Sequence, residues 1–173
     1  MVRLLGLGLA AALMMAGPVL AEDEQVQYSD APTADCLAGA ETAEAMRACI
    51  GLATAKCVDA SDYGSTTIGM MQCAEKETAF WDGKLNATYK DLMARAEKFD
   101  KMNADDPRIV EKIADSLRAM QRAWIPYRDA TCTFQYSLGM GGTIASTLAS
   151  HCQLDMTAEQ FIYLTHAWEP LGN

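Results

Sequence analysis

The residues of this 173-residue chain that could act as nucleophiles or metal ligands include six cysteines and two histidines. A catalytic cysteine or serine needs a histidine base to activate it, whereas an even number of cysteines in an oxidising compartment is typical of disulfides. His151 stands beside Cys152, but no further ligands follow at zinc spacing. We therefore expect disulfides, with no catalytic residues, no metal site and no cofactor, and we predict that the protein is not an enzyme.

Two polar segments have the composition of ligand-binding loops without their spacing. The glycine-rich run at 139–142 lacks the Lys-Ser/Thr end of a phosphate-binding loop and follows no predicted strand. Asp59 and Asp62 miss the spacing of a calcium-binding loop, which also needs a closing glutamate. Both segments are therefore predicted to be turns.

Three aromatic residues, Trp81, Trp124 and Tyr127, have rings that could stack on a carbohydrate. They also fall at helical spacing on apolar stripes, where aromatic residues more often belong to the core of a protein. We expect core packing for all three, with Trp81 and Trp124 at similar heights in a pair of antiparallel helices.

Arg128 and Asp129 are adjacent on a predicted helix, where neighbouring residues do not face each other. Arg128 is therefore expected to pair with Asp82 or Glu77 on the facing helix. A partly buried ion pair of this kind fixes the register of two helices more than it stabilises them. Arg128 and Asp129 are accordingly predicted to have a structural role.

The apolar residues recur every three or four positions, which predicts an all-α protein. The expected helices are 41–59, 68–101, 107–137, a short helix from Thr143 to about Cys152, and a last helix that begins with a Thr157–Gln160 capping box. Helix 68–101 should be roughly 50 Å long, at about 1.5 Å per residue. We predict a long antiparallel helical hairpin, with shorter flanking helices held to it by disulfides.

The first 21 residues have the pattern of a secretory signal peptide. Arg3 precedes an apolar run at 4–16, and small residues at 19–21 form a cleavage site. No cysteine stands at the cleavage point, and no later segment is long enough to span a bilayer. We expect a periplasmic or secreted protein with no membrane anchor after signal cleavage.

The formal net charge of −9 at pH 7 restricts the class of partner. Loss of Arg3 with the signal would make the mature chain one unit more negative. This acidity argues against binding to nucleic acid or to anionic membranes. It is compatible with a basic protein partner, although an acidic surface also serves simply to keep an exported protein soluble.

Two runs of residues carry a resemblance to a known family. The first contains Thr67, Met70 and Cys73, followed by Asp82, Leu85, Asn86, Tyr89 and Leu92; the second contains Trp124, Tyr127, Arg128, Asp129 and Cys132, followed by Cys152. With these spacings, roughly residues 57 to 165 resemble the LprI-like lysozyme inhibitors, which are small secreted helical proteins. The chain departs from the family pattern at Gly69 and Gln160, where the family usually has Glu and Arg.

The resemblance implies a disulfide pairing and a division of the chain. Family-like pairs are Cys57 with Cys73 and Cys132 with Cys152, which leaves Cys36 with Cys49. One rival remains open, because folding the two long helices together would bring Cys73 near the level of Cys132. The implied division is a signal peptide at 1–21, an N-terminal extension with the extra cysteine pair at 22–56, and an LprI-like helical domain at 57–173.

The resemblance also implies a function. The expected activity is inhibition of a lysozyme-type muramidase by steric blocking of its cleft, with a basic lysozyme as partner. The alternative is an envelope protein-interaction or scaffold module that does not inhibit lysozyme. The candidate partner contacts are the acidic turns, Asp59 with Asp62 and Asp105 with Asp106, because loops on a rigid scaffold commonly carry binding surfaces.

Overall fold

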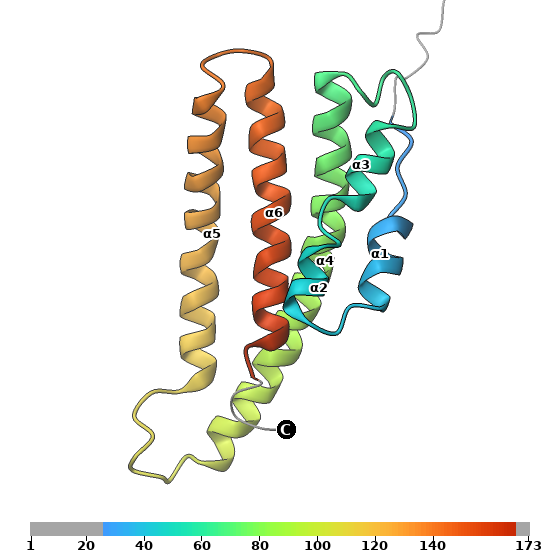
Figure 1. Cartoon of the computed structure of the whole chain (residues 1–173). Helices are drawn as coiled ribbons and strands as arrows, with labels where there is room; N and C mark the ends of the chain where they lie inside the picture. Colours follow the sequence, from blue (N-terminus) through green and yellow to red (C-terminus); the bar gives the residue numbers. More distant parts are fainter. Residues whose placement is uncertain (1–25, 169–173) are drawn as a thin grey trace, which may run out of the picture.

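The computed structural model describes residues 26–168, which form helices joined by turns, with no strand in that range (Figure 1). The helices are α1 (Ala31–Ala38), α2 (Ala43–Arg47), α3 (Leu52–Val58), α4 (Thr67–Met102), α5 (Ile113–Leu138) and α6 (Ile144–His166). The predicted all-α class is therefore confirmed. The predicted signal peptide, residues 1–21, lies outside the described residues.

The long helices α4, α5 and α6 run alternately in opposite directions (Figure 1). Helix α6 makes the most extensive contacts, first with α4 and then with α5, whereas α4 and α5 touch each other much less. Among the short helices, α3 packs against α4 and α2 packs against α6, while α1 packs mainly against α3. Helix α6 is thus the element that joins α5 to α4.

The core extends along α6 in two neighbouring groups of apolar side chains. Trp81, which is completely buried, packs with Leu154 and Ala158 and against the Phe161 ring, with ring centroids 5.6 Å apart. A second group surrounds Leu85, Leu92 and Leu164, and the half-buried Trp124 and Trp168 pack against it. Trp81 is therefore a core residue, as predicted, and Trp124 lies in the adjoining group at the edge of the core.

The single helix predicted at 41–59 is wrong, because the chain breaks into α2 and α3 at Gly51. This glycine has a φ of 85°, a left-handed conformation that residues with a Cβ rarely adopt. The buried Glu77 carboxylate of α4 accepts hydrogen bonds from the backbone N–H groups of Gly51 (2.9 Å) and Thr54 (2.6 Å). Glu77 thereby satisfies amides at the start of α3 that have no partner inside the helix.

Other buried groups complete the environment of the Glu77 side chain. Its Oε1 also accepts hydrogen bonds from the Thr33 hydroxyl (2.8 Å) and from Trp81 Nε1 (3.1 Å). The Thr33 hydroxyl oxygen in turn accepts from the N–H of Ala53 (3.0 Å). One carboxylate thus holds α1 and α3 onto α4.

The predicted start of the third helix at Pro107 is also wrong, since α5 begins at Ile113. The Asp106 carboxylate accepts hydrogen bonds from Arg108, from both its backbone N–H and its guanidinium, and forms a local turn instead of a helix cap. The first amides of α5, those of Ile113 and Ala114, donate to the carboxylate of Asp100 at 3.0 and 2.9 Å. An acidic residue of α4 therefore caps α5 as well.

The two C-terminal helices predicted from Thr143 and Thr157 are a single continuous helix, α6. Residues 143–168 contain neither glycine nor proline, so no backbone feature interrupts the helix. Thr157 lies completely buried within α6. The capping-box prediction is wrong because a Thr-x-x-Gln pattern also fits the interior of a helix.

Three disulfides tie neighbouring elements together. They join Cys36 to Cys49, Cys57 to Cys73, and Cys132 to Cys152, which are the three pairs that the family resemblance implies, and not the rival Cys73–Cys132 bond. The last bond links α5 to α6 across a sequence separation of 20 residues. In the chain-entropy description, closing a loop of this size stabilises the folded state by about 3 kcal/mol.

Candidate functional site

Two turns lie at the same end of the molecule, and we call residues 59–66 together with residues 138–144 the turn end. The first segment leads into α4 and the second joins α5 to α6, and both lie at the top of Figure 1. Thr147, in the first turn of α6, donates its hydroxyl to the carbonyl of Thr67, the first residue of α4, at 3.5 Å. The helices that follow the two turns are thus in contact at this end of the molecule.

The α5–α6 turn presents apolar side chains to solvent. Leu138 and Ile144 are about half exposed, and Met140 is 89% exposed. Met140 and Gly141 both have positive φ, at 47° and 77°, and a Cβ on Gly139 would lie only 2.6 Å from Ala145. The turn is therefore tight, and the disulfide between α5 and α6 limits how far its two sides can separate.

The charge distribution separates this turn from the rest of the molecule. Residues 130–154 contain no aspartate, glutamate, lysine or arginine, in a chain with a net charge of −9. The neighbouring segment of the turn end carries Asp59 and Asp62, both exposed. The turn end therefore combines an uncharged apolar projection with an acidic flank.

The four aspartates expected to contact a partner lie at opposite ends of the molecule. Asp59 and Asp62 precede the start of α4, whereas Asp105 and Asp106 follow its end. The 36 residues of α4 span about 54 Å. Hydrogen bonds from Arg108 lower the pKa of Asp106, so this carboxylate is charged but already paired. Only the first pair of aspartates lies at the same end of the molecule as the apolar turn.

The family-like residues of α4 make contacts within the protein. Leu85 is buried in the core, and Tyr89 packs against the same group of side chains. Asn86 donates to the Asp82 carboxylate at 2.8 Å, one turn earlier on the same helix. Leu85 and Tyr89 therefore contribute to core packing, and Asp82 and Asn86 contribute a hydrogen bond within α4.

The prediction that Arg128 pairs with Asp82 or Glu77 is wrong. Its guanidinium donates two hydrogen bonds to Asp129, at 2.9 and 3.0 Å, and lies over the Trp124 ring, 4.9 Å from the ring centroid. The long arginine side chain can fold back along its own helix, so the rule for adjacent residues does not hold here. The two carboxylates expected to be its partners are bonded within the α1–α4 region.

The expected core position of Tyr127 is also wrong, because its side chain is 64% exposed. With Trp124 and Tyr163 it borders an open groove of about 420 Å³ between α5 and α6, whose other lining residues are Met120, Ala123 and Gln160. Tyr127 lies at the exposed border of this groove, whereas Trp124 and Arg128 of the same helix are partly buried. This aromatic groove lies part-way along the helices, away from the turn end.

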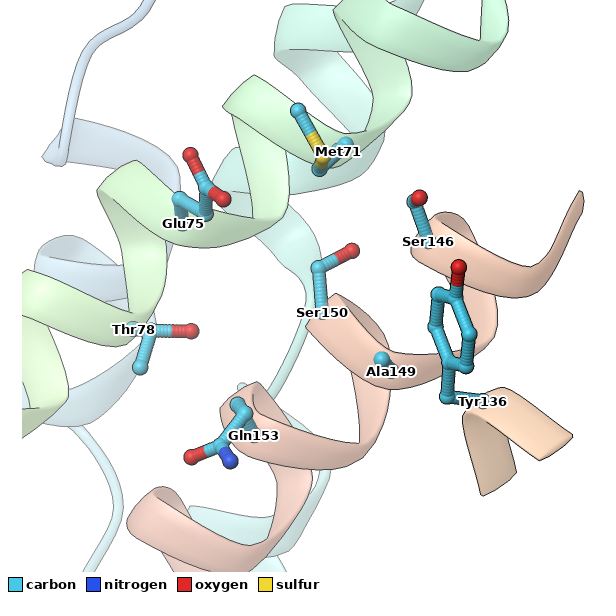
Figure 2. Close-up of a pocket in the computed structure, with 8 residues that line it drawn as sticks. All are labelled: Met71, Glu75, Thr78, Tyr136, Ser146, Ala149, Ser150 and Gln153. Atoms are coloured by element: carbon cyan, nitrogen blue, oxygen red, sulfur yellow. The ribbon is translucent and has the colours of Figure 1, made fainter. Parts of the chain in front are cut away.

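A second pocket lies next to the turn end, at the junction of the three long helices (Figure 2). It has a volume of about 410 Å³ and is lined by Met71, Glu75 and Thr78 of α4, Tyr136 of α5, and Ser146, Ala149, Ser150 and Gln153 of α6. None of these residues was singled out from the sequence. Their grouping depends on α6 lying between α4 and α5, which periodicity alone does not reveal.

Most of the chain, including this end of the molecule, matches a known protein family. Residues 57–164 match the family described as lysozyme inhibitor LprI. The chain belongs to the LprI family. The match runs from the last two residues of α3 almost to the end of α6, so it includes the turn end and the pocket beside it.

Two uncharacterised proteins are also similar to this chain. An uncharacterised 17.7 kDa protein from the puhA 5′ region of Rhodobacter capsulatus is 32% identical over 143 residues, covering 78% of this chain and 83% of the relative. An uncharacterised protein of Rhizobium meliloti (strain 1021) is 30% identical over 101 residues, covering 58% and 73% respectively. No solved structure matches the chain significantly.

The remaining features of this LprI protein concern metals and membranes. Across residues 26–168, no three histidine, cysteine, aspartate or glutamate side chains come together in a way that could hold a metal ion. None of the helices in this part of the chain is long and apolar enough to cross a membrane.

Proposed function

We propose that this protein inhibits a lysozyme-type muramidase outside the cytoplasm, by placing the turn end in the substrate cleft of the enzyme. The observation that carries the proposal is the LprI family match over the segment that contains both turns. The expected signal peptide supports delivery to the compartment in which muramidases act.

The chemistry of the turn end suits such a cleft. Glycosidases of this kind use two carboxyl groups that flank the scissile bond. A blocking segment with its own negative charges would be repelled by them, but the segment 130–154 carries none. Met140 and its neighbours can bury apolar surface inside the cleft, while Asp59 and Asp62 attract the basic surface around it.

Removing charge from the turn end should slow inhibition, and removing it from the opposite end should not. We expect Asp59→Asn with Asp62→Asn to lower the association rate with a basic lysozyme severalfold at low salt, because charge mainly speeds encounter. The difference should shrink as salt rises toward 0.15 M, where the Debye length is about 8 Å. Muramidase assays at two salt concentrations would measure both effects.

The matched control for this experiment is Asp105→Asn with Asp106→Asn, which makes the same charge change beyond the far end of α4. Met140→Asn provides a third variant, since asparagine tolerates the left-handed backbone but removes the apolar side chain. Equal slowing by both aspartate pairs would contradict the placement of the site. Absence of inhibition with every basic lysozyme tested at low salt would contradict the proposed function itself.

A second candidate function is that of an envelope protein-interaction module, and the aromatic groove favours it. Tyr127 and Tyr163 are 64% and 58% exposed on either side of this groove. Exposed tyrosine and tryptophan are enriched at the energetic centres of protein interfaces. Capture of an envelope protein that depends on Tyr127, without inhibition of lysozyme, would favour this alternative.

A further inference from the structure

The pocket in Figure 2 has an unusual distribution of small and large side chains. Its floor is one side of α6, where Ser146, Ala149 and Ser150 leave room above the helix. Met71 of α4 and Tyr136 of α5 stand on opposite sides of this floor. The resulting space can receive a group about as large as one side chain against mostly apolar walls.

Several polar atoms around the pocket can only accept hydrogen bonds, whereas the Gln153 amide and the Ser146 and Tyr136 hydroxyls can both donate and accept. The Ser150 hydroxyl donates its proton to the carbonyl of Thr147 at 3.1 Å, and the Thr78 hydroxyl donates to that of Ala74 at 2.8 Å. The oxygen lone pairs of both hydroxyls remain available as acceptors. Glu75, whose ionised carboxylate is also an acceptor, is exposed and belongs to none of the ion pairs found among residues 26–168.

A ligand that suits this pocket has hydrogen-bond donors, a positive charge and an apolar stem. Lysine and arginine side chains meet all three requirements, because their charged groups donate without accepting and their stems are aliphatic. The stem can lie along Met71 and Ala149, and the charged group can reach Glu75 or the face of the Tyr136 ring. The pocket itself contributes one negative charge and no positive charge.

We infer that this pocket binds a lysine or arginine side chain of the basic protein that the turn end engages. The inference rests on the proposed function for the identity of that partner. Met71 lies one turn beyond the first residue of α4, and Ser146 lies two residues beyond Ile144. The pocket is therefore a continuation of the turn end and can accept a side chain from the same partner.

The pocket can be tested without any lysozyme by titrating the full chain with n-butylguanidinium, which combines a guanidinium group with a short alkyl stem. We expect saturable shifts of the Met71 and Ala149 methyl resonances in NMR spectra. Glu75→Gln should weaken this binding roughly five- to tenfold, because it removes the charge that the guanidinium group meets. Glu111→Gln, at an exposed position near the far end of α4, is the matched control.

The neutral probe 1-pentanol tests whether the pocket recognises the positive charge or only the alkyl chain of n-butylguanidinium. Shifts with n-butylguanidinium that persist unchanged in Glu75→Gln, or equally strong binding of 1-pentanol, would overturn the inference. The absence of a saturable shift at either methyl group would also overturn it.

A second measurement connects the pocket to inhibition. Glu75→Gln should raise the dissociation rate of the complex with a basic lysozyme, whereas Glu111→Gln should leave it unchanged. If no lysozyme is inhibited but n-butylguanidinium binds as described, the proposed function fails and the cation pocket stands. If inhibition occurs and is unaffected by Glu75→Gln, the pocket inference fails and the proposed function stands.

Discussion

Replacing Glu77 with alanine is expected to lower the free energy of unfolding by about 3–5 kcal/mol, because it removes a buried group to which several donors bind. Glu77 is completely buried, and its carboxylate accepts hydrogen bonds from Gly51, Thr54, Thr33 and Trp81. Without it, the first amides of α3 and the indole N–H of Trp81 lose their partner away from water. Urea unfolding of the oxidised protein, followed by circular dichroism, would measure the loss.

Glu75→Ala is the matched control for this substitution. Glu75 lies two residues earlier on the same helix and is exposed, so its replacement should change stability by no more than about 0.5 kcal/mol. A Glu77→Ala protein as stable as this control would mean that the carboxylate does not hold the α1–α3 region onto α4.

Trp81→Ala is expected to destabilise the protein by about 3–5 kcal/mol, and Trp124→Ala by clearly less, on the order of 1–2 kcal/mol. Trp81 is completely buried and also donates to Glu77, so its removal leaves a cavity and takes one donor away from that buried carboxylate. Trp124 is half-buried, and the Arg128 guanidinium lies over its ring.

Paired urea titrations of the two tryptophan variants would measure this order of stability. Tryptophan fluorescence provides an independent check, since a soluble quencher should reach Trp124 but not Trp81. An equal loss of stability in both variants would show that Trp124 is as deeply packed as Trp81.

The regular part of the fold was predictable because it depends on local periodicity. The apolar positions of α4 repeat at helical spacing over its whole length, and its observed bounds differ from the expected ones by one residue at each end. The starts of α3 and α5 depend instead on carboxylates contributed by Glu77 and Asp100 of another helix. A capping partner that distant in the sequence has no local signature.

The candidate site was predictable only in its acidic part. Asp59 and Asp62 stand out in a polar turn, but Leu138, Met140 and Ile144 surround a glycine-rich turn whose direction cannot be inferred from spacing. Tyr127 fits an apolar stripe when α5 is considered alone. Its exposure follows from which side of α5 meets α6, and that is a tertiary property.

Two carboxylates of α4 cap the first turns of other helices, so the unfolding of those turns is coupled to the unfolding of α4. Ordinary helix ends fray independently, and their first amides exchange hydrogen through local opening. The first amides of α3 and α5 are held by Glu77 and Asp100, so they are released only when α4 moves away from them or unfolds. We expect Thr54 and Ala114 to exchange with nearly the same protection as the centre of α4, a pattern that hydrogen exchange measured residue by residue would reveal.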